Sequence, residues 1–121
     1  MTERLFVYGT LRPGRAPSEI ADAVNTLVPL GPAAVRGRLY NLGSYPGLVL
    51  DEQADEVHGE ILAVPDAATL ARLDAYEDYR PNGPDPDASL FLRVRTAVTL
   101  PTGASELCWV YVYNRPIPEK P

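Results

Sequence analysis

Hydrophobic positions alternate with polar ones along much of the chain, and this period of two predicts several short strands. Residues 4–8 are apolar on both faces, which is typical of a central strand. Residues 90–100 alternate strictly, and the turn PTGA after them leads into a returning strand at residues 105–113. Further strands are predicted at residues 35–42, with Val35, Gly37 and Leu39 on one face, at residues 47–50 and at residues 56–64.

Two segments have the spacing of helices instead. In residues 17–27 the apolar side chains recur at i, i+3, i+4 and i+7 and form one stripe. Asp66 is a suitable N-cap for a second helix that ends near residue 78. About six short strands with two helices predict an α+β domain whose sheet is small and strongly curved or closed.

Composition and charge narrow the functional classes. The 121 residues suit a single domain, and the formal charge of −5 disfavours a surface that binds nucleic acid. The sequence has no apolar run of about 18 residues that would span a membrane, and its first residues are unlike a signal peptide. One cysteine and one histidine argue against a disulfide framework and against a structural metal site. We therefore expect a cytoplasmic protein without a bound metal.

The stretch LFVYGTLRPG, residues 5–14, joins a buried strand directly to a loop with two glycines. The strand fixes the start of the loop, and Gly9 lacks a Cβ, so a ligand can approach the main chain there. The spacing of the glycines matches neither a dinucleotide-binding nor a P-loop fingerprint. The stretch is therefore either an ordinary turn or a loop whose backbone N–H groups hold a carboxylate or an oxyanion.

A carboxylate lies on the apolar face of the second predicted helix. Leu70 and Leu73 define that face, and Glu77, seven residues after Leu70, lies within about 20° of the same direction. Partial burial there would raise the pKa of Glu77 and make it a better base than a solvated glutamate. Asp74 lies close to the same stripe and is the competing candidate. In the alternative interpretation Glu77 is solvated at the helix end and pairs with Arg80.

Other polar and aromatic residues have structural interpretations. His58 lies within a predicted strand and is expected to be a satisfied structural histidine, not a base. Cys108 has no basic neighbour in the sequence and is expected to be a small core residue. Trp109, Tyr111 and Tyr113 share one strand face, which is typical of a core, although the open end of a barrel would expose Tyr113 to a pocket.

Five motifs occur in a recognisable order: VYGTLRPG after the first strand, YPG in the middle, HGEIL in a strand, LDAYEDY at a helix end and VYVYNRP near the end of the chain. Together they extend from Leu5 to about Pro116. In these motifs the chain resembles the gamma-glutamylcyclotransferase-like family, which includes the AIG2-like proteins and the gamma-glutamylamine cyclotransferases. The resemblance implies a small mixed β-barrel flanked by two or more helices, in agreement with the α+β fold expected from the pattern.

The resemblance also implies a site. The acid–base glutamate of the family corresponds to Glu77, which the helix geometry had already placed on the apolar face. The substrate-binding positions that correspond are Tyr8, Gly9, Thr10, Leu11 and Tyr113. Phe91 stands where the family often has a tyrosine, and the proline-rich loop at residues 79–89 is long, so both features leave the substrate open.

The reaction that the resemblance implies needs neither a cofactor nor a metal. A γ-glutamyl amide or peptide carries its own nucleophile, the α-amino group, which closes a lactam and releases 5-oxoproline and a free amine. A rival hypothesis is a binding module that keeps the pocket without turnover. Glu77 favours the enzyme, because a carboxylate is a poor choice for binding an anionic ligand.

Overall fold

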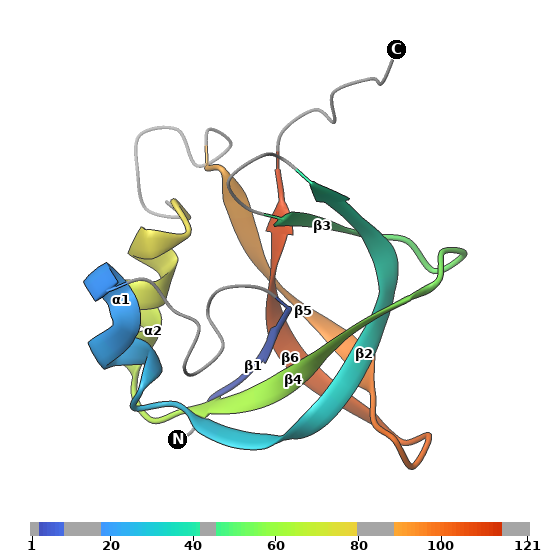
Figure 1. The fold of residues 1–121 in the computed structure, drawn as a ribbon, viewed down its shortest axis with the longest axis horizontal. Helices are drawn as coiled ribbons and strands as arrows, with labels where there is room; N and C mark the ends of the chain where they lie inside the picture. The colour runs from blue at the N-terminus through green and yellow to red at the C-terminus, as the bar shows by residue number, and fades with distance from the viewer. Residues whose placement is uncertain (1–2, 9–17, 42–45, 80–88, 115–121) are drawn as a thin grey trace.

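A computed structural model of the chain describes residues 3–8, 18–41, 46–79 and 89–114. The elements follow one another as β1 (Glu3–Val7), α1 (Ser18–Val24), β2 (Val28–Asn41), β3 (Pro46–Leu50), β4 (Glu56–Val64), α2 (Ala67–Tyr76), β5 (Phe91–Thr99) and β6 (Ser105–Tyr113). Strands β2, β4, β1, β6 and β5 form a barrel that closes where β5 pairs with β2, and β3 adds to β2 (Figure 1). Among these strands β1 and β6 are parallel and the other neighbours antiparallel. The predicted α+β fold, a small mixed β-barrel flanked by helices, is confirmed.

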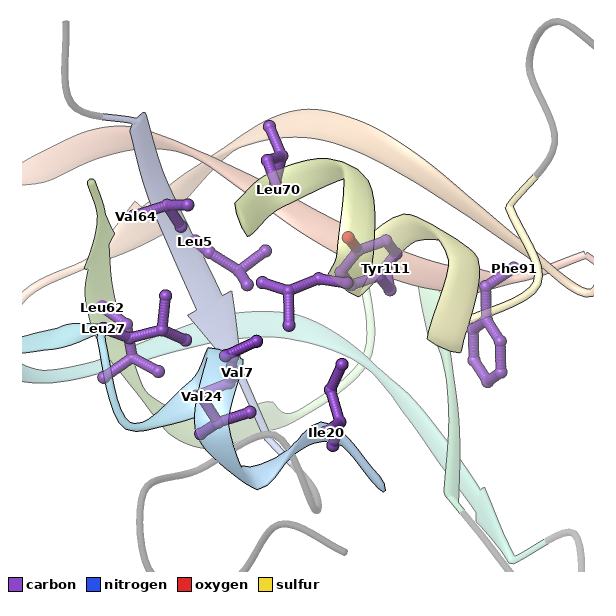
Figure 2. Close-up of a cluster of buried hydrophobic side chains, with 12 residues drawn as sticks. Leu5, Val7, Ile20, Val24, Leu27, Leu62, Val64, Leu70, Phe91 and Tyr111 are labelled. Atoms are coloured by element: carbon purple, nitrogen blue, oxygen red, sulfur yellow. The ribbon is translucent and has the colours of Figure 1, made fainter. Parts of the chain in front are cut away.

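Side chains on the two faces of the barrel wall form two separate cores. One consists of buried strand residues alone and fills the barrel: Phe6, Ala33, Val35, Leu48, Ile61, Val98, Cys108 and Val110. The other lies between the wall and the two helices, and it includes Leu5, Val7, Ile20, Val24, Leu62, Leu70 and Tyr111 (Figure 2). Strand β1 contributes to both cores, which explains why its sequence is apolar on both faces.

The helices lie side by side against one part of the barrel (Figure 1). Helix α1 buries the predicted stripe of Ile20, Ala23 and Val24. Helix α2 begins after Asp66, whose side chain accepts a hydrogen bond of 2.8 Å from the backbone N–H of Thr69, as an N-cap does. Neither helix in the described part of the chain is both long and apolar enough to cross a bilayer.

Strand β2 begins seven residues earlier than the predicted start at residue 35, and this boundary was wrong. Pro29 and Pro32 lie in this additional part of the strand, where a proline cannot donate a ladder hydrogen bond. The chain accommodates them with a β-bulge between Pro29 and Gly31, where Gly31 has a φ of 132°. Such a bulge increases the local bend and twist of a strand, which helps a sheet of few strands to close.

The other end of β2 extends beyond the barrel. From Gly37 onward the strand pairs with β3 and no longer with β4. Val35 and Gly37 are buried as expected, but Leu39 is 48% exposed. The three residues do alternate onto one face of β2, as expected, and Leu39 is exposed on it because this part of β2 pairs with β3 and no longer with β4.

Gly59 on β4 allows β1 to pack closely against it. A Cβ at this position would lie 2.1 Å from the Val7 carbonyl oxygen and 2.9 Å from the Phe6 ring. We expect Gly59→Ala to lower the free energy of unfolding by about 2 kcal/mol, because inserted atoms must displace a backbone carbonyl. Urea denaturation measures this, with Ala97→Ser at an exposed strand position as a control that should change stability by less than about 0.5 kcal/mol. Equal midpoints for the glycine variant and wild type would contradict the close approach.

Candidate active site at the mouth of the barrel

Strands β1 and β6 separate at one end of the barrel, and Tyr8 bridges the gap. In the described residues the two strands share one register pair, Leu5 with Trp109. Two residues further along β6, the Tyr111 carbonyl accepts a hydrogen bond of 2.7 Å from the Tyr8 hydroxyl. A side chain therefore takes the place of a strand-to-strand backbone bond, and it anchors the chain immediately before residue 9.

The end of helix α2 sets the position of Glu77, which is its C-cap. The next two N–H groups turn back onto the helix: Asp78 donates to the Ala75 carbonyl at 3.2 Å, and Tyr79 donates to the Asp74 carbonyl at 2.9 Å. Asp78 has the left-handed φ of 57° that this Schellman arrangement requires and that glycine usually supplies. The helix consequently stops at a defined residue, and the direction in which Glu77 projects is defined with it.

The Glu77 carboxylate lies in a poorly solvated environment. Burial raises its pKa to about 7, and no hydrogen bond or ion pair from another described residue offsets that effect. Burial also raises the pKa values of the Tyr8 and Tyr111 hydroxyls, and the negative charge of Glu77 raises both further. The three groups are therefore close together, although they come from β1, α2 and β6. Glu77 itself is half-buried, and Arg80 lies outside the described residues, so the alternative in which Glu77 pairs with Arg80 stays a prediction.

Asp74, the competing carboxylate, is fully engaged by other groups. The Arg93 side chain donates to both of its oxygens, at 2.8 and 3.2 Å, and the Tyr111 hydroxyl donates at 2.6 Å. A carboxylate held by three hydrogen bonds and a guanidinium is not available to accept a proton from a ligand. The arrangement favours Glu77 over Asp74 as a base.

The remaining predicted positions lie along the same side of the molecule or outside the described residues. Tyr113 is two residues beyond Tyr111 on β6, and its ring meets that of Phe91 edge to face, with centroids 5.7 Å apart. Phe91 is buried, so the ring that replaces the family's frequent tyrosine has an apolar packing role. Gly9, Thr10 and Leu11 lie outside the described residues, and their predicted role in binding stays a prediction.

The two ends of the proline-rich loop meet beside the helix end. The Leu90 N–H donates to the Asp78 carbonyl at 3.0 Å, and the Asn114 N–H donates to the Leu90 carbonyl at 2.9 Å. The loop thus leaves and rejoins the fold next to Glu77 and the end of β6. Residues 80–88 themselves lie outside the described residues.

His58 and Cys108 have no part in this cluster. His58 is exposed on β4, so the expectation of a satisfied structural histidine is wrong. Cys108 is buried inside the barrel, as expected, with its thiol free. Among the residues that the structure describes, no three His, Cys, Asp or Glu side chains form a group that could hold a metal ion.

Cys108 is expected to be chemically inert in the folded protein. Burial raises the pKa of its thiol to about 11, so only about 0.1% of it is thiolate at pH 8. A disulfide reagent such as dithionitrobenzoate should react with the native protein at least about 100-fold more slowly than with the protein in denaturant. Equal rates in the two states would show that Cys108 is accessible and activated.

Arg93 and Tyr111 are site residues that the sequence did not single out. Arg93 is the cross-strand partner of Tyr111, and its guanidinium lies 4.3 Å from the centre of the Trp109 ring. The aromatic row on β6 was visible in the sequence. The sequence did not reveal the register of β5 against β6. That register brings Arg93 beside the aromatic row and within hydrogen-bond distance of Asp74.

The fold and the site together define a class: a small closed barrel with two helices on one side and a half-buried carboxylate where the second helix ends. The family model described as "Gamma-glutamyl cyclotransferase, AIG2-like" matches residues 5–121. The chain therefore belongs to the gamma-glutamyl cyclotransferase, AIG2-like family. The predicted family is confirmed, and the predicted enzyme class, gamma-glutamylcyclotransferase-like, is confirmed at the level of the family.

Individual relatives agree with this. The chain is 39% identical over 112 residues to the gamma-L-glutamyl-butirosin B gamma-glutamyl cyclotransferase of Niallia circulans, covering 92% of this chain and 67% of the relative. An AIG2-like protein from Mus musculus superposes with a TM-score of 0.75 at 26% identity, over 97% of this chain and 80% of that one. YkqA from Bacillus subtilis shares the fold, with a TM-score of 0.69 at 21% identity; the match covers 94% of this chain but spans 36% of YkqA.

Proposed function

We propose that this protein cleaves a γ-glutamyl amide or peptide by intramolecular aminolysis, releasing 5-oxoproline and a free amine, with Glu77 as the acid–base group. The observation that carries the proposal is the position of Glu77, which is half-buried at the end of α2, near enough to Tyr8 for its charge to raise the pKa of that hydroxyl, and whose own pKa burial raises to about 7. A general base is most effective when its pKa lies near the working pH. An ordinary surface glutamate is a much weaker base.

The proposed proton transfers balance without a second reactant. The α-ammonium of the substrate must first lose a proton, and its ordinary pKa of about 8 is close to that of Glu77. The amine then attacks the γ-carbonyl carbon and forms the lactam C–N bond. As the tetrahedral intermediate collapses, Glu77 returns this proton to the leaving nitrogen, the original amide C–N bond breaks, and Glu77 takes the second proton from the attacking nitrogen, which becomes the lactam N–H. Glu77 then passes that second proton to the released amine, which departs as an ammonium ion. Glu77 ends the cycle ionised, as it began.

The binding half of the proposal rests on the chain that follows β1. Tyr8 is anchored through its hydroxyl to β6, so the backbone of residues 9–11 starts from a fixed point. Its N–H groups would hold the γ-carbonyl oxygen as negative charge develops on it. Tyr113 would line the same pocket. Holding the substrate in its folded, cyclisation-ready conformer would contribute a large part of the rate.

The proposal names the leaving amine only by its chemical class. The Niallia circulans relative is named for a γ-glutamyl group on butirosin B. We therefore include γ-glutamyl amines, together with γ-glutamyl amino acids and glutathione, among the candidate substrates.

We propose a cytoplasmic location, as expected from the sequence. The single cysteine, Cys108, is free and buried, so this fold does not depend on a disulfide. Disulfide-free folds are the rule in reducing compartments. Fractionation of the native host's cells would test this separately from the activity.

A substrate screen tests the function directly. The purified protein is incubated with each member of the panel near neutral pH, and 5-oxoproline is quantified by mass spectrometry. We expect release from at least one member and none from the matching α-glutamyl amides, whose amine cannot close the same five-membered ring. Ligand binding by calorimetry without any 5-oxoproline would support the rival hypothesis of a binding module.

A further inference from the structure

A polar cluster connects the last turns of α2 to the barrel wall. Asp74 on α2 binds Arg93 on β5 and Tyr111 on β6, and those two residues are direct cross-strand partners. The side chains of Arg93 and Asp74 are only 16% and 14% exposed. Water and salt screen such a pair much less than they screen a pair on the surface.

The same cluster is connected to the end of α2, which carries Glu77, and to Tyr8 at the end of β1. Asp74 lies three residues before Glu77, which puts the two on the same side of the helix. Tyr111 contacts α2 through its hydroxyl and accepts the Tyr8 hydroxyl with its carbonyl. One residue of β6 is therefore bonded to the helix that carries Glu77 and to the strand end that precedes residue 9.

The burial of Glu77 creates a need for such a cluster. A carboxylate that loses water without gaining a partner is destabilised, and it is stabilised again if the helix end moves outward into solvent. Bonds between the helix and the wall oppose that movement. Asp74 supplies them within one turn of Glu77, where they control its position most directly.

We propose that Asp74 is a positioning residue for Glu77, and that its bonds to Arg93 and Tyr111 hold the Glu77 carboxylate beside Tyr8 and away from water. This inference rests on the proposed acid–base function of Glu77. Arg93 holds Asp74 with two donors, and its guanidinium lies on Trp109, which limits its own freedom.

The ionisable groups around Glu77 come from four elements. Tyr8 and Tyr111 are near enough for the charge of Glu77 to raise their pKa values, Asp74 lies on the same helix, and Arg93 is bonded to Asp74. Asp78 and Tyr79 follow Glu77 in the chain and turn back onto the helix through their N–H groups. Removing Asp74 leaves the positive charge of Arg93 unbalanced and admits water, and both changes favour the ionised form of Glu77.

Helix α2 also offers a matched control. Arg72 donates to both oxygens of Asp22 on α1, at 3.1 and 2.9 Å, which is the same two-bond geometry. This pair is exposed and connects the two helices, not α2 to the barrel. Breaking it removes two hydrogen bonds from α2, against three for the loss of Asp74, without touching the cluster around Asp74.

The test compares Asp74→Ala, Tyr111→Phe, Arg93→Lys and the control Arg72→Met. The titration midpoint of Glu77 is measured by carboxyl ¹³C NMR, with its signal assigned by its absence in Glu77→Gln. We expect Asp74→Ala to lower the midpoint by at least about half a pH unit and kcat by about 10- to 100-fold, with KM within about threefold. Tyr111→Phe should lower the midpoint and kcat by smaller amounts than Asp74→Ala does. Arg93→Lys should have a kcat between those of Asp74→Ala and wild type. Arg72→Met should change neither the midpoint nor kcat.

A wild-type midpoint in Asp74→Ala, or an equal shift in Arg72→Met, would overturn the proposal. If Asp74→Ala does not fold, Tyr111→Phe decides, since it removes a single oxygen atom and keeps the ring in the core. The midpoint is measured without substrate. Absence of 5-oxoproline from the wild type would therefore refute the proposed function, while the midpoints would still show whether Asp74 positions Glu77.

Discussion

Glu77→Gln is expected to reduce kcat for 5-oxoproline release by about 10² to 10⁴, the usual worth of a general base. The amide keeps the size of the side chain but cannot take a proton from the substrate ammonium. Binding of a γ-glutamyl ligand should persist, because the backbone that follows Tyr8 is unchanged. Steady-state kinetics near neutral pH, together with calorimetry of binding, measure both quantities.

Glu77→Asp is the matched comparison for this variant. It keeps the carboxylate but withdraws it by one methylene, so we expect a smaller loss than with glutamine and a pH profile that still falls on the acidic side. A glutamine variant that turns over at the wild-type rate would show that Glu77 is not the base. Loss of ligand binding together with turnover would instead assign Glu77 to binding.

The same substitution should make the protein more stable, by an amount that depends on pH. Burial raises the pKa of Glu77 from 4.5 to about 7 in the folded state, so the native protein binds this proton more readily than the unfolded chain. Ionisation therefore costs native stability as pH rises from about 4.5 to 7, and the cost is constant above that range. At about 1.4 kcal/mol per pKa unit, Glu77→Gln should gain up to about 3 kcal/mol above pH 7 and nothing below pH 4.5.

Urea denaturation of both proteins between pH 4 and pH 8 measures this difference. Glu52→Gln, at an exposed position after β3, controls for the removal of one carboxylate and should give a small effect without this pH dependence. A constant difference between Glu77→Gln and wild type over the whole range would mean that Glu77 is well hydrated. The opposite signs expected for turnover and stability are typical of groups that a fold retains for function.

Most of the fold could be predicted from the sequence because the local hydrophobic patterns match the strands and helices that the barrel contains. Strict alternation located β5, the turn PTGA after it located β6, and the stripe of Ile20, Ala23 and Val24 located α1. The start of β2 was wrong because a bulge around Gly31 accommodates prolines that ordinarily end a strand. No local rule reveals such a bulge, since it depends on the partner strand and on closure of the barrel.

Only the part of the candidate site that lies on a single helix could be predicted from the sequence. The angle between Glu77 and Leu70 on a helical projection follows from the sequence, and in the structure Glu77 is half-buried, with a pKa that burial raises. The hydrogen bonds of Asp74 do not follow from the sequence, because they depend on the register between β5 and β6 and on how α2 lies across the barrel wall. The Tyr8 hydroxyl bond depends likewise on the separation of two strands far apart in sequence.

The meeting of the two ends of the proline-rich loop has a consequence for changes in the length of that loop. Because the Leu90 N–H bonds to the Asp78 carbonyl, the span across the base of the loop is fixed whatever the number of residues in between. Lengthening a loop whose ends are already joined costs little entropy, about 0.6 kcal/mol for each doubling. We therefore expect a change in the length of the segment between these two residues to leave the hydrogen bond at its base in place, together with Glu77, which lies one residue before that base.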